Sequence, residues 1–67
     1  MLVVVKMKNY EVTAVIRYYD CIDGKVQEEL SHETVFAESR ADAGSFYIER
    51  MSLDDITVME ITEILEY

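Results

Sequence analysis

The chain has 67 residues and a formal net charge of −8 at pH 7, a size that allows one domain near the lower limit at which a core is stable without disulfides, metals or a partner. Hydrophobic residues make up 51% of it, which excludes disorder because disordered segments contain too few apolar residues to form a core. The strong negative charge disfavours direct binding to nucleic acid or to an anionic membrane, and it attracts basic protein surfaces.

The cysteine content and the apolar segments indicate where the protein works. Cys21 is the single cysteine, so no internal disulfide forms and a reducing compartment is expected. The apolar residues 2–5 are too short for a signal-peptide core and have no basic residue before them. No stretch approaches the ~20 apolar residues needed to cross a bilayer. We therefore expect a soluble, cytoplasmic protein.

The first part of the chain has the pattern of a β-hairpin. Polar and apolar residues alternate over residues 10–18, which predicts a strand with one polar side. Asp23-Gly24 follows, a dipeptide that suits a two-residue type I′ turn because both central residues need positive φ. The second strand is then expected over residues 25–37.

A two-residue turn at Asp23-Gly24 would fix the register of this hairpin. Val12 would face Val35 and Tyr10 would face Ala37, which makes the base of the hairpin apolar on its inner face. Towards the tip the same face carries polar residues, so the tip should be exposed and the sheet buried on one side only. Other predicted neighbours are Cys21 with Val26, Tyr18 with Glu29, Asp20 with Gln27, and His32 with Val15.

A helix is expected to begin after Ser39 and to end near Met51. Ser39 suits an N-cap, and Asp42 is acidic at the third helical position. Gly44 would cost the helix roughly 1 kcal/mol, so it either permits a close approach to the sheet or is merely tolerated. The predicted apolar stripe is Gly44, Tyr47, Ile48 and Met51, with Ala43 and Phe46 beside it.

The closing residues 56–67 are rich in β-branched side chains, which favours a third strand. Their alternation is imperfect, because Met59, Ile61 and Leu65 share one side while Ile56, Val58 and Ile64 share the other. A bulge or two buried faces would explain this pattern. A second helix capped by Ser52 is the alternative.

Together these elements predict an α+β fold in one domain, residues 1–67, with the order (β)ββαβ. The sheet is expected to be mainly antiparallel, with one helix packed on one face. Residues 2–5 could form a further strand, so residues 1–8 are either an extension or an edge strand. The chain has no proline and two glycines, which is consistent with a few long elements joined by short connections.

The sequence predicts no catalytic, cofactor-binding or metal-binding site. Cys21 and His32 are its only thiol–imidazole pair, but Cys21 lies beside the hairpin turn and His32 lies well down the second strand. A thiol nucleophile needs its base within hydrogen-bond reach. Residues 20–24 resemble part of a calcium loop, yet Tyr19 and Leu30 stand where that loop needs acidic ligands.

Charge and tyrosines suggest a surface that binds a partner protein. Residues 1–19 carry a net charge of +2, and residues 20–67 carry −10. Tyr18 and Tyr19 point to opposite faces of a strand, so one is expected to be exposed, and exposed tyrosines often anchor protein interfaces. The alternative is that the acids serve solubility alone. The candidate partner-binding residues are Tyr18, Tyr19, Asp20, Glu28, Glu29, Glu33, Asp54, Asp55, Glu60 and Glu63.

In general character the chain resembles the small acidic proteins of phages and mobile elements, including anti-CRISPR and other DNA-mimic inhibitors. The resemblance covers the hairpin "YEVTAVIRYYDCIDGKV", the strand and capped helix "TVFAESRADAGSFYIE" and the closing strand "ITVMEITEIL". It implies a protein that binds a host nucleic-acid-handling complex, in the host cytoplasm, and blocks it. That group shares no motif, so no functional residue is carried over, and the positive residues 1–19 depart from a pure nucleic-acid mimic.

Two functional hypotheses follow from the sequence. The first is a non-enzymatic inhibitor that docks its acidic surface on a basic protein which holds DNA or RNA. The second is a structural module, such as a homodimer, that associates with itself through a sheet edge formed by residues 2–5 or residues 56–67, because apolar edges invite pairing. An enzyme that uses His32 or Cys21 comes third.

Overall fold

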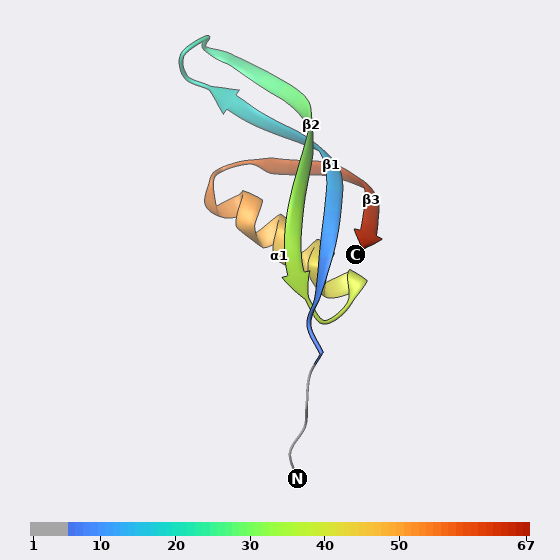
Figure 1. Ribbon diagram of the computed structural model, residues 1–67. Coiled ribbons are helices and arrows are strands. Elements are labelled where there is room, and N and C mark those ends of the chain that lie inside the picture. The colour runs from blue at the N-terminus through green and yellow to red at the C-terminus, as the bar shows by residue number, and fades with distance from the viewer. Residues whose placement is uncertain (1–5) are drawn as a thin grey trace.

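The computed structural model describes residues 6–67 and shows a three-stranded antiparallel sheet with one helix (Figure 1). The elements follow the order β1 (Lys8–Asp20), β2 (Lys25–Ala37), α1 (Arg40–Leu53) and β3 (Thr57–Glu66). The predicted ββαβ order and α+β class are confirmed. The further strand suggested for residues 2–5 lies outside the described residues.

The first strand is the centre of the sheet, whose strand order is β2-β1-β3. Helix α1 contacts all three strands and covers one face, which we call the inner face. The opposite face, which we call the open face, carries no element within residues 6–67. In β1 the even-numbered side chains from Tyr10 to Ile16 point inward and are buried, as the alternating sequence predicts.

The turn between β1 and β2 differs from the predicted two-residue turn. Four residues, Cys21 to Gly24, connect the strands, and Asp20 pairs with Lys25. Oδ1 of Asp20 accepts hydrogen bonds from the backbone N–H groups of Ile22 and Asp23, at 2.9 Å and 3.3 Å. Such an Asx-type turn stabilises the longer loop. Gly24 has φ +67°, which suits glycine, whereas Asp23 does not adopt positive φ.

The longer turn shifts the pairing of β1 with β2 by two residues from the predicted register. Tyr10 lies opposite Val35 instead of Ala37, and Val12 lies opposite Glu33 instead of Val35. The side-chain period of a strand is two, so this shift keeps every residue on its predicted face. The remaining predicted pairs are also replaced: Tyr19 faces Val26, Tyr18 faces Gln27, Asp20 faces Lys25, Ile16 faces Glu29 and Thr13 faces His32.

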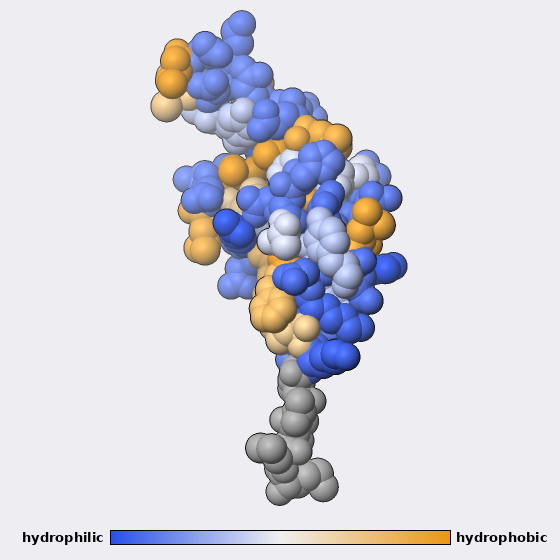
Figure 2. Space-filling view, in the orientation of Figure 1, coloured by the Kyte–Doolittle hydropathy of each residue, from blue (hydrophilic) through white to orange (hydrophobic). Residues whose placement is uncertain are grey.

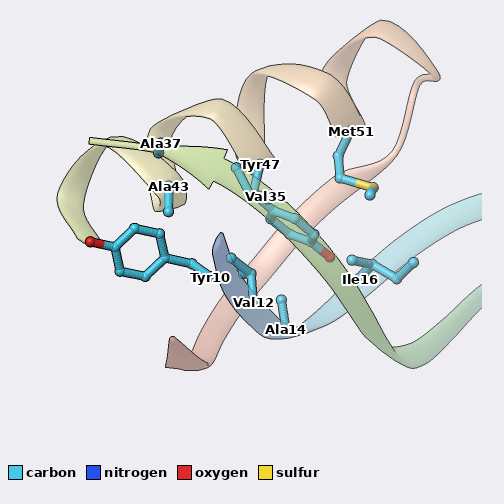
Figure 3. Close-up of a cluster of buried hydrophobic side chains, with 9 residues drawn as sticks. All are labelled: Tyr10, Val12, Ala14, Ile16, Val35, Ala37, Ala43, Tyr47 and Met51. Atoms are coloured by element: carbon cyan, nitrogen blue, oxygen red, sulfur yellow. The ribbon is translucent and has the colours of Figure 1, made fainter. Parts of the chain in front are cut away.

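The core lies between α1 and the inner face of the sheet (Figure 3). Tyr47 is fully buried at its centre, and its ring lies beside Val35 with the hydroxyl directed toward Ile16. This hydroxyl has no hydrogen-bond partner within residues 6–67. The buried core consists of Tyr10, Val12, Ala14, Ile16, Val35, Ala37, Ala43, Tyr47 and Met51.

Both ends of α1 have side-chain or backbone caps. Ser39 is the N-cap, as predicted, and its Oγ accepts a hydrogen bond from the N–H of Asp42 at 3.2 Å. At the other end the N–H of Ile56 reaches the carbonyl of Met51 at 3.0 Å, and the N–H of Asp55 reaches that of Ser52 at 3.2 Å. These two bonds form a Schellman motif with Asp55 in the left-handed position, φ 58°.

The buried face of α1 differs in part from the predicted apolar stripe. Gly44, Tyr47 and Met51 are buried as expected, and Ala43 joins them. Ile48 and Phe46 are wrong assignments, because they are 48% and 47% exposed. A Cβ atom on Gly44 would lie 3.4 Å from Cδ1 of Ile64, so the glycine does sit in close contact with β3.

The closing segment is the predicted strand, and the alternative helix from Ser52 is wrong. Two register shifts occur along the β1–β3 pair, which confirms the predicted bulge. The shifts leave Thr62 and Met59 as extra residues and place Val58, Ile61 and Ile64 on the inner face, three positions apart. No helix in the described part of the chain is long and apolar enough to cross a membrane.

Candidate docking arm

The tip of the hairpin projects from the sheet as a two-stranded ribbon (Figure 1). The pairing of β3 with β1 ends at Arg17, so β1 and β2 continue alone over residues 18–27, and Glu28 and Glu29 lie at the base of this ribbon opposite Arg17 and Ile16. We call residues 18–29 the arm. None of its residues is buried. The arm therefore extends the molecule and adds only the half-buried Tyr18 to the edge of its core.

The arm is acidic along its length and apolar at its end. It contains Asp20, Asp23, Glu28 and Glu29 against Lys25, a net charge of −3. The space-filling view shows a mainly hydrophilic arm with a hydrophobic patch at its end (Figure 2). Ile22 in the turn is 92% exposed. An exposed isoleucine at the end of an acidic projection has no role in folding that the structure shows.

The two adjacent tyrosines of the arm differ in exposure, as the strand pattern predicts. Tyr19 is 65% exposed on the open face beside Val26. Tyr18 points inward, is half-buried and packs against the edge of the core. Partial desolvation, followed by the negative charges of Glu29 and Asp20, raises the pKa of Tyr18 above its ordinary value. Tyr19 is thus the exposed aromatic residue of the arm.

Local contacts already engage some of the acidic groups of the arm. Asp20 holds the turn through its two backbone hydrogen bonds. Nη2 of Arg17 lies 3.2 Å from Oε2 of Glu28, directly across the two strands. Asp23 and Glu29 have no Lys or Arg within 4.0 Å among residues 6–67, so their charges are available to a partner.

The structure brings five of the ten candidate partner-binding residues together on the arm: Tyr18, Tyr19, Asp20, Glu28 and Glu29. The other five lie elsewhere. Glu33 is on the inner face of β2, with Oε2 3.0 Å from Nη1 of Arg50 in an ion pair without an aligned hydrogen bond. Asp54 and Asp55 form the C-terminal cap of α1. Glu60 and Glu63 pair with Val15 and Thr13 on the open face.

A polar network that sequence reasoning missed lies at the centre of the open face. Oγ1 of Thr13 is 3.0 Å from Nδ1 of His32, and Oε1 of Glu11 is 3.8 Å from the same nitrogen. The hydroxyl of Tyr67 donates to Glu11, and this hydrogen bond is the main cause that raises the pKa of Tyr67. The network depends on the shifted hairpin register, because the predicted register placed His32 beside Val15.

The described residues show no enclosed reaction site. No pocket is present within residues 6–67, and no group of three metal-ligating side chains is found there. Cys21 is exposed in the turn, whereas His32 lies seven residues along β2 from Lys25, about 23 Å at the rise of a strand. The two side chains do not form a dyad.

Comparison with known proteins gives no match: no family model, curated protein or solved structure is similar to this chain.

Proposed function

We propose that the protein is a non-enzymatic inhibitor that docks on a basic surface of a host nucleic-acid-handling complex. The arm is its main docking element, and it occupies a groove that otherwise holds DNA or RNA. The acidic flanks of the arm supply the attraction, while Ile22 and Tyr19 supply the apolar contact. The general likeness to small acidic phage and mobile-element inhibitors of the anti-CRISPR type supports this proposal and the host cytoplasm as the place of action.

The observation that carries the proposal is the arm itself. A two-stranded hairpin that packs on nothing is marginally stable in water. Beyond the half-buried Tyr18 at its base, the arm has no packing partner within residues 6–67, and it exposes Tyr19, Ile22 and Val26 to solvent. Apart from Tyr18, the residues of the arm add nothing to the core. A partner that covers the arm gives these residues a role.

The surplus of negative charge supports the same conclusion. Of the 14 acidic residues in the chain, three lie within 4.0 Å of a Lys or Arg among residues 6–67: Glu28, Glu33 and Glu66. Asp54 and Asp55 even stand at the C-terminal end of α1, where the helix dipole disfavours negative charge. Negative charge at this position destabilises the helix. It can serve instead to attract a basic partner at long range.

Charge variants of the arm test the proposal. Asp23→Asn, Glu28→Gln and Glu29→Gln together remove three negative charges from the arm and leave Asp20 to hold the turn. The matched control is Glu38→Gln, Glu49→Gln and Glu60→Gln, which removes three charges from other exposed sites. Capture of partners from the native host, with nuclease present and over a salt series, is measured for both variants. We expect the arm variant to lose capture and the control to retain most of it.

Two results would contradict the proposal in different ways. Equal capture by the arm variant and the control would show that the arm is not part of the interface. Capture that does not weaken as salt rises would remove electrostatic attraction as its basis, since salt screens exposed charges. In addition, nucleic acid should compete with the protein for the captured partner.

Self-association through a sheet edge is the second candidate, and the position of β3 favours it. β3 is an edge strand of the sheet, as self-association through residues 56–67 requires, and its two bulges leave short regular stretches for pairing. Molecular mass in solution tests it, with deletion of residues 1–6 as a test of the N-terminal version. A monomer over the working concentration range would exclude self-association, and an oligomer that survives the deletion would exclude residues 1–6 as its cause.

A further inference from the structure

The two edges of the sheet differ in how well they are protected against pairing with another strand. β3 is interrupted by two bulges, at Met59 and Thr62, and bulges are one of the means by which proteins block edge pairing. β2 is 13 residues long, and its register with β1 is continuous from Lys25 to Ala37. It contains no proline, and β1 is its only neighbour in the sheet within residues 6–67. In Figure 1 β2 lies at the front, ahead of β1.

The side chains of β2 define what kind of strand could be added to it. On the open face its exposed apolar residues are Val26, Leu30 and Phe36, at 61%, 57% and 58% exposure. On the inner face, beyond the part that α1 covers, it presents the carboxylate of Glu29, and Glu33 follows closer to the helix. An added strand would therefore meet mainly apolar side chains on the open face, where Glu28 lies between Val26 and Leu30 in an ion pair with Arg17, and carboxylates on the inner face.

We propose that the free edge of β2 binds an extended, Lys/Arg-rich segment of the basic partner, with apolar side chains at alternate positions. The segment continues the sheet by β-augmentation: main-chain hydrogen bonds to β2 supply affinity, and the alternating side chains supply specificity. Its basic side chains lie beside Glu29 and Glu33, and its apolar side chains lie beside Val26, Leu30 and Phe36. This inference rests on the proposed function, since it takes the partner to be basic.

Charge favours such a segment over a second copy of this chain at the same edge. β2 carries Glu28, Glu29 and Glu33 near its middle against Lys25 at its start. Two copies paired edge to edge across this middle would bring six carboxylates close together, and like charges opposite one another are destabilising. A basic segment turns the same carboxylates into attractive contacts.

A synthetic peptide of about eight residues, alternating lysine and valine, is the probe, since this length matches an ordinary strand. The control peptide has the same composition but alternates L-lysine with D-valine, so it keeps the charge and cannot adopt a regular strand. We expect the all-L peptide to bind about tenfold more tightly at low salt, a difference of about 1.4 kcal/mol. Amide hydrogen exchange should show new protection in β2 and none in β3.

Two protein variants locate the contact. Leu30→Lys and Leu65→Lys each add one positive charge at an exposed leucine of the open face, the first on β2 and the second on β3. We expect Leu30→Lys to weaken binding of the all-L peptide about fivefold, through lost apolar contact and added repulsion. Leu65→Lys should leave it within about twofold, since its charge lies at the other edge.

Several outcomes would overturn the inference. Equal binding of the two peptides would show attraction by charge alone, and protection of β3 would assign the wrong edge. Equal weakening by both variants would show that net charge matters and position does not. Failure of this test with salt-sensitive capture of the native partner intact would leave the proposed function standing. Conversely, if the peptide binds along β2 but no basic partner is captured, the result would support β2 as a peptide-binding edge and contradict the proposed function.

Discussion

The buried tyrosine at the centre of the core carries a polar group that the core does not satisfy. Tyr47 is fully buried, and its hydroxyl has no hydrogen-bond partner within residues 6–67. A buried donor without a partner costs about 1–3 kcal/mol. The ring, in contrast, fills the space between α1 and the sheet. At Tyr47 the packing of the ring therefore stabilises the fold, while the unsatisfied hydroxyl destabilises it.

Tyr47→Phe should raise the free energy of unfolding by about 1 kcal/mol, because it keeps the ring and removes the unsatisfied hydroxyl. Urea unfolding measures the change. Tyr10→Phe is the matched control, since the hydroxyl of Tyr10 is 3.3 Å from Oε1 of Glu66 and its loss should give no gain. A loss of stability in Tyr47→Phe would show that the hydroxyl has a partner in solution.

Asp55 is a second residue whose conformation and charge lower the stability of the fold. It ends α1 in the left-handed region, φ 58°, where a residue with a Cβ is strained by about 1–2 kcal/mol. Its negative charge also faces the C-terminal end of the helix dipole. Glycine is the usual residue at this position of a Schellman motif.

Asp55→Gly should therefore stabilise the protein by about 1 kcal/mol in thermal or urea unfolding. Asp54→Gly makes the same change of charge one residue earlier, where φ is −99° and no such strain exists. It should give no comparable gain. If the two variants change stability equally, the effect comes from charge, and backbone strain at Asp55 contributes nothing measurable.

At the scale of elements, strand and helix positions were predictable because they follow local patterns. The alternation in β1, the bounds of β2 and the cap at Ser39 depend on neighbouring residues, and the structure confirms them. The hairpin register was not predictable from Asp23-Gly24 alone, because the side chain of Asp20 stabilises a longer turn. This small difference moved His32 from Val15 to Thr13 and created the polar network of the open face.

The third strand shows why bulges limit such predictions. A regular strand cannot place Val58, Ile61 and Ile64 on one face, since they are three positions apart. Two bulges shift the alternation of side chains, so that all three residues face inward. The positions of these bulges depend on contacts with β1, such as the hydrogen bond from Thr62 Oγ1 to the carbonyl of Thr13 at 3.1 Å. For the same reason the candidate site was half predictable: the five arm residues adjoin the turn, whereas the other five depend on how α1 and β3 pack.

An ion pair joins the start of β1 to the end of β3. Nζ of Lys8 is 3.1 Å from Oε1 of Glu66. The hydrogen bond from Lys8, followed by its charge, lowers the pKa of Glu66 below its ordinary value in the folded protein. A carboxyl whose pKa is lower in the folded state contributes stability above its unfolded pKa, and this contribution is lost as pH falls through the folded pKa.

Glu66→Gln should therefore make stability less dependent on pH between about pH 5 and pH 3. The measurement is the free energy of unfolding in urea at a series of pH values. Glu60→Gln is the control, because Glu60 has no Lys or Arg within 4.0 Å among residues 6–67. An unchanged pH profile in Glu66→Gln would show that the ion pair does not persist in solution.

At the scale of the whole molecule, one property acts on both folding and binding. A net charge of −8 on 67 residues repels itself in the compact state and attracts a basic partner at a distance. Salt screens both effects: the screening length falls from about 10 Å at 0.1 M to about 3 Å at 1 M. The same ions should thus strengthen the fold and weaken the complex.

The midpoint of thermal unfolding should therefore rise when sodium chloride increases from about 0.1 M to about 1 M. A gain of 1 kcal/mol corresponds to about 4–8 °C for a domain of this size. The variant with Glu38→Gln, Glu49→Gln and Glu60→Gln should show a smaller rise, because it has less repulsion to screen. A falling midpoint, or the same rise in both proteins, would contradict this account of the charge. If the midpoint rises with salt as expected, loss of partner capture over the same range comes from the interface, not from unfolding.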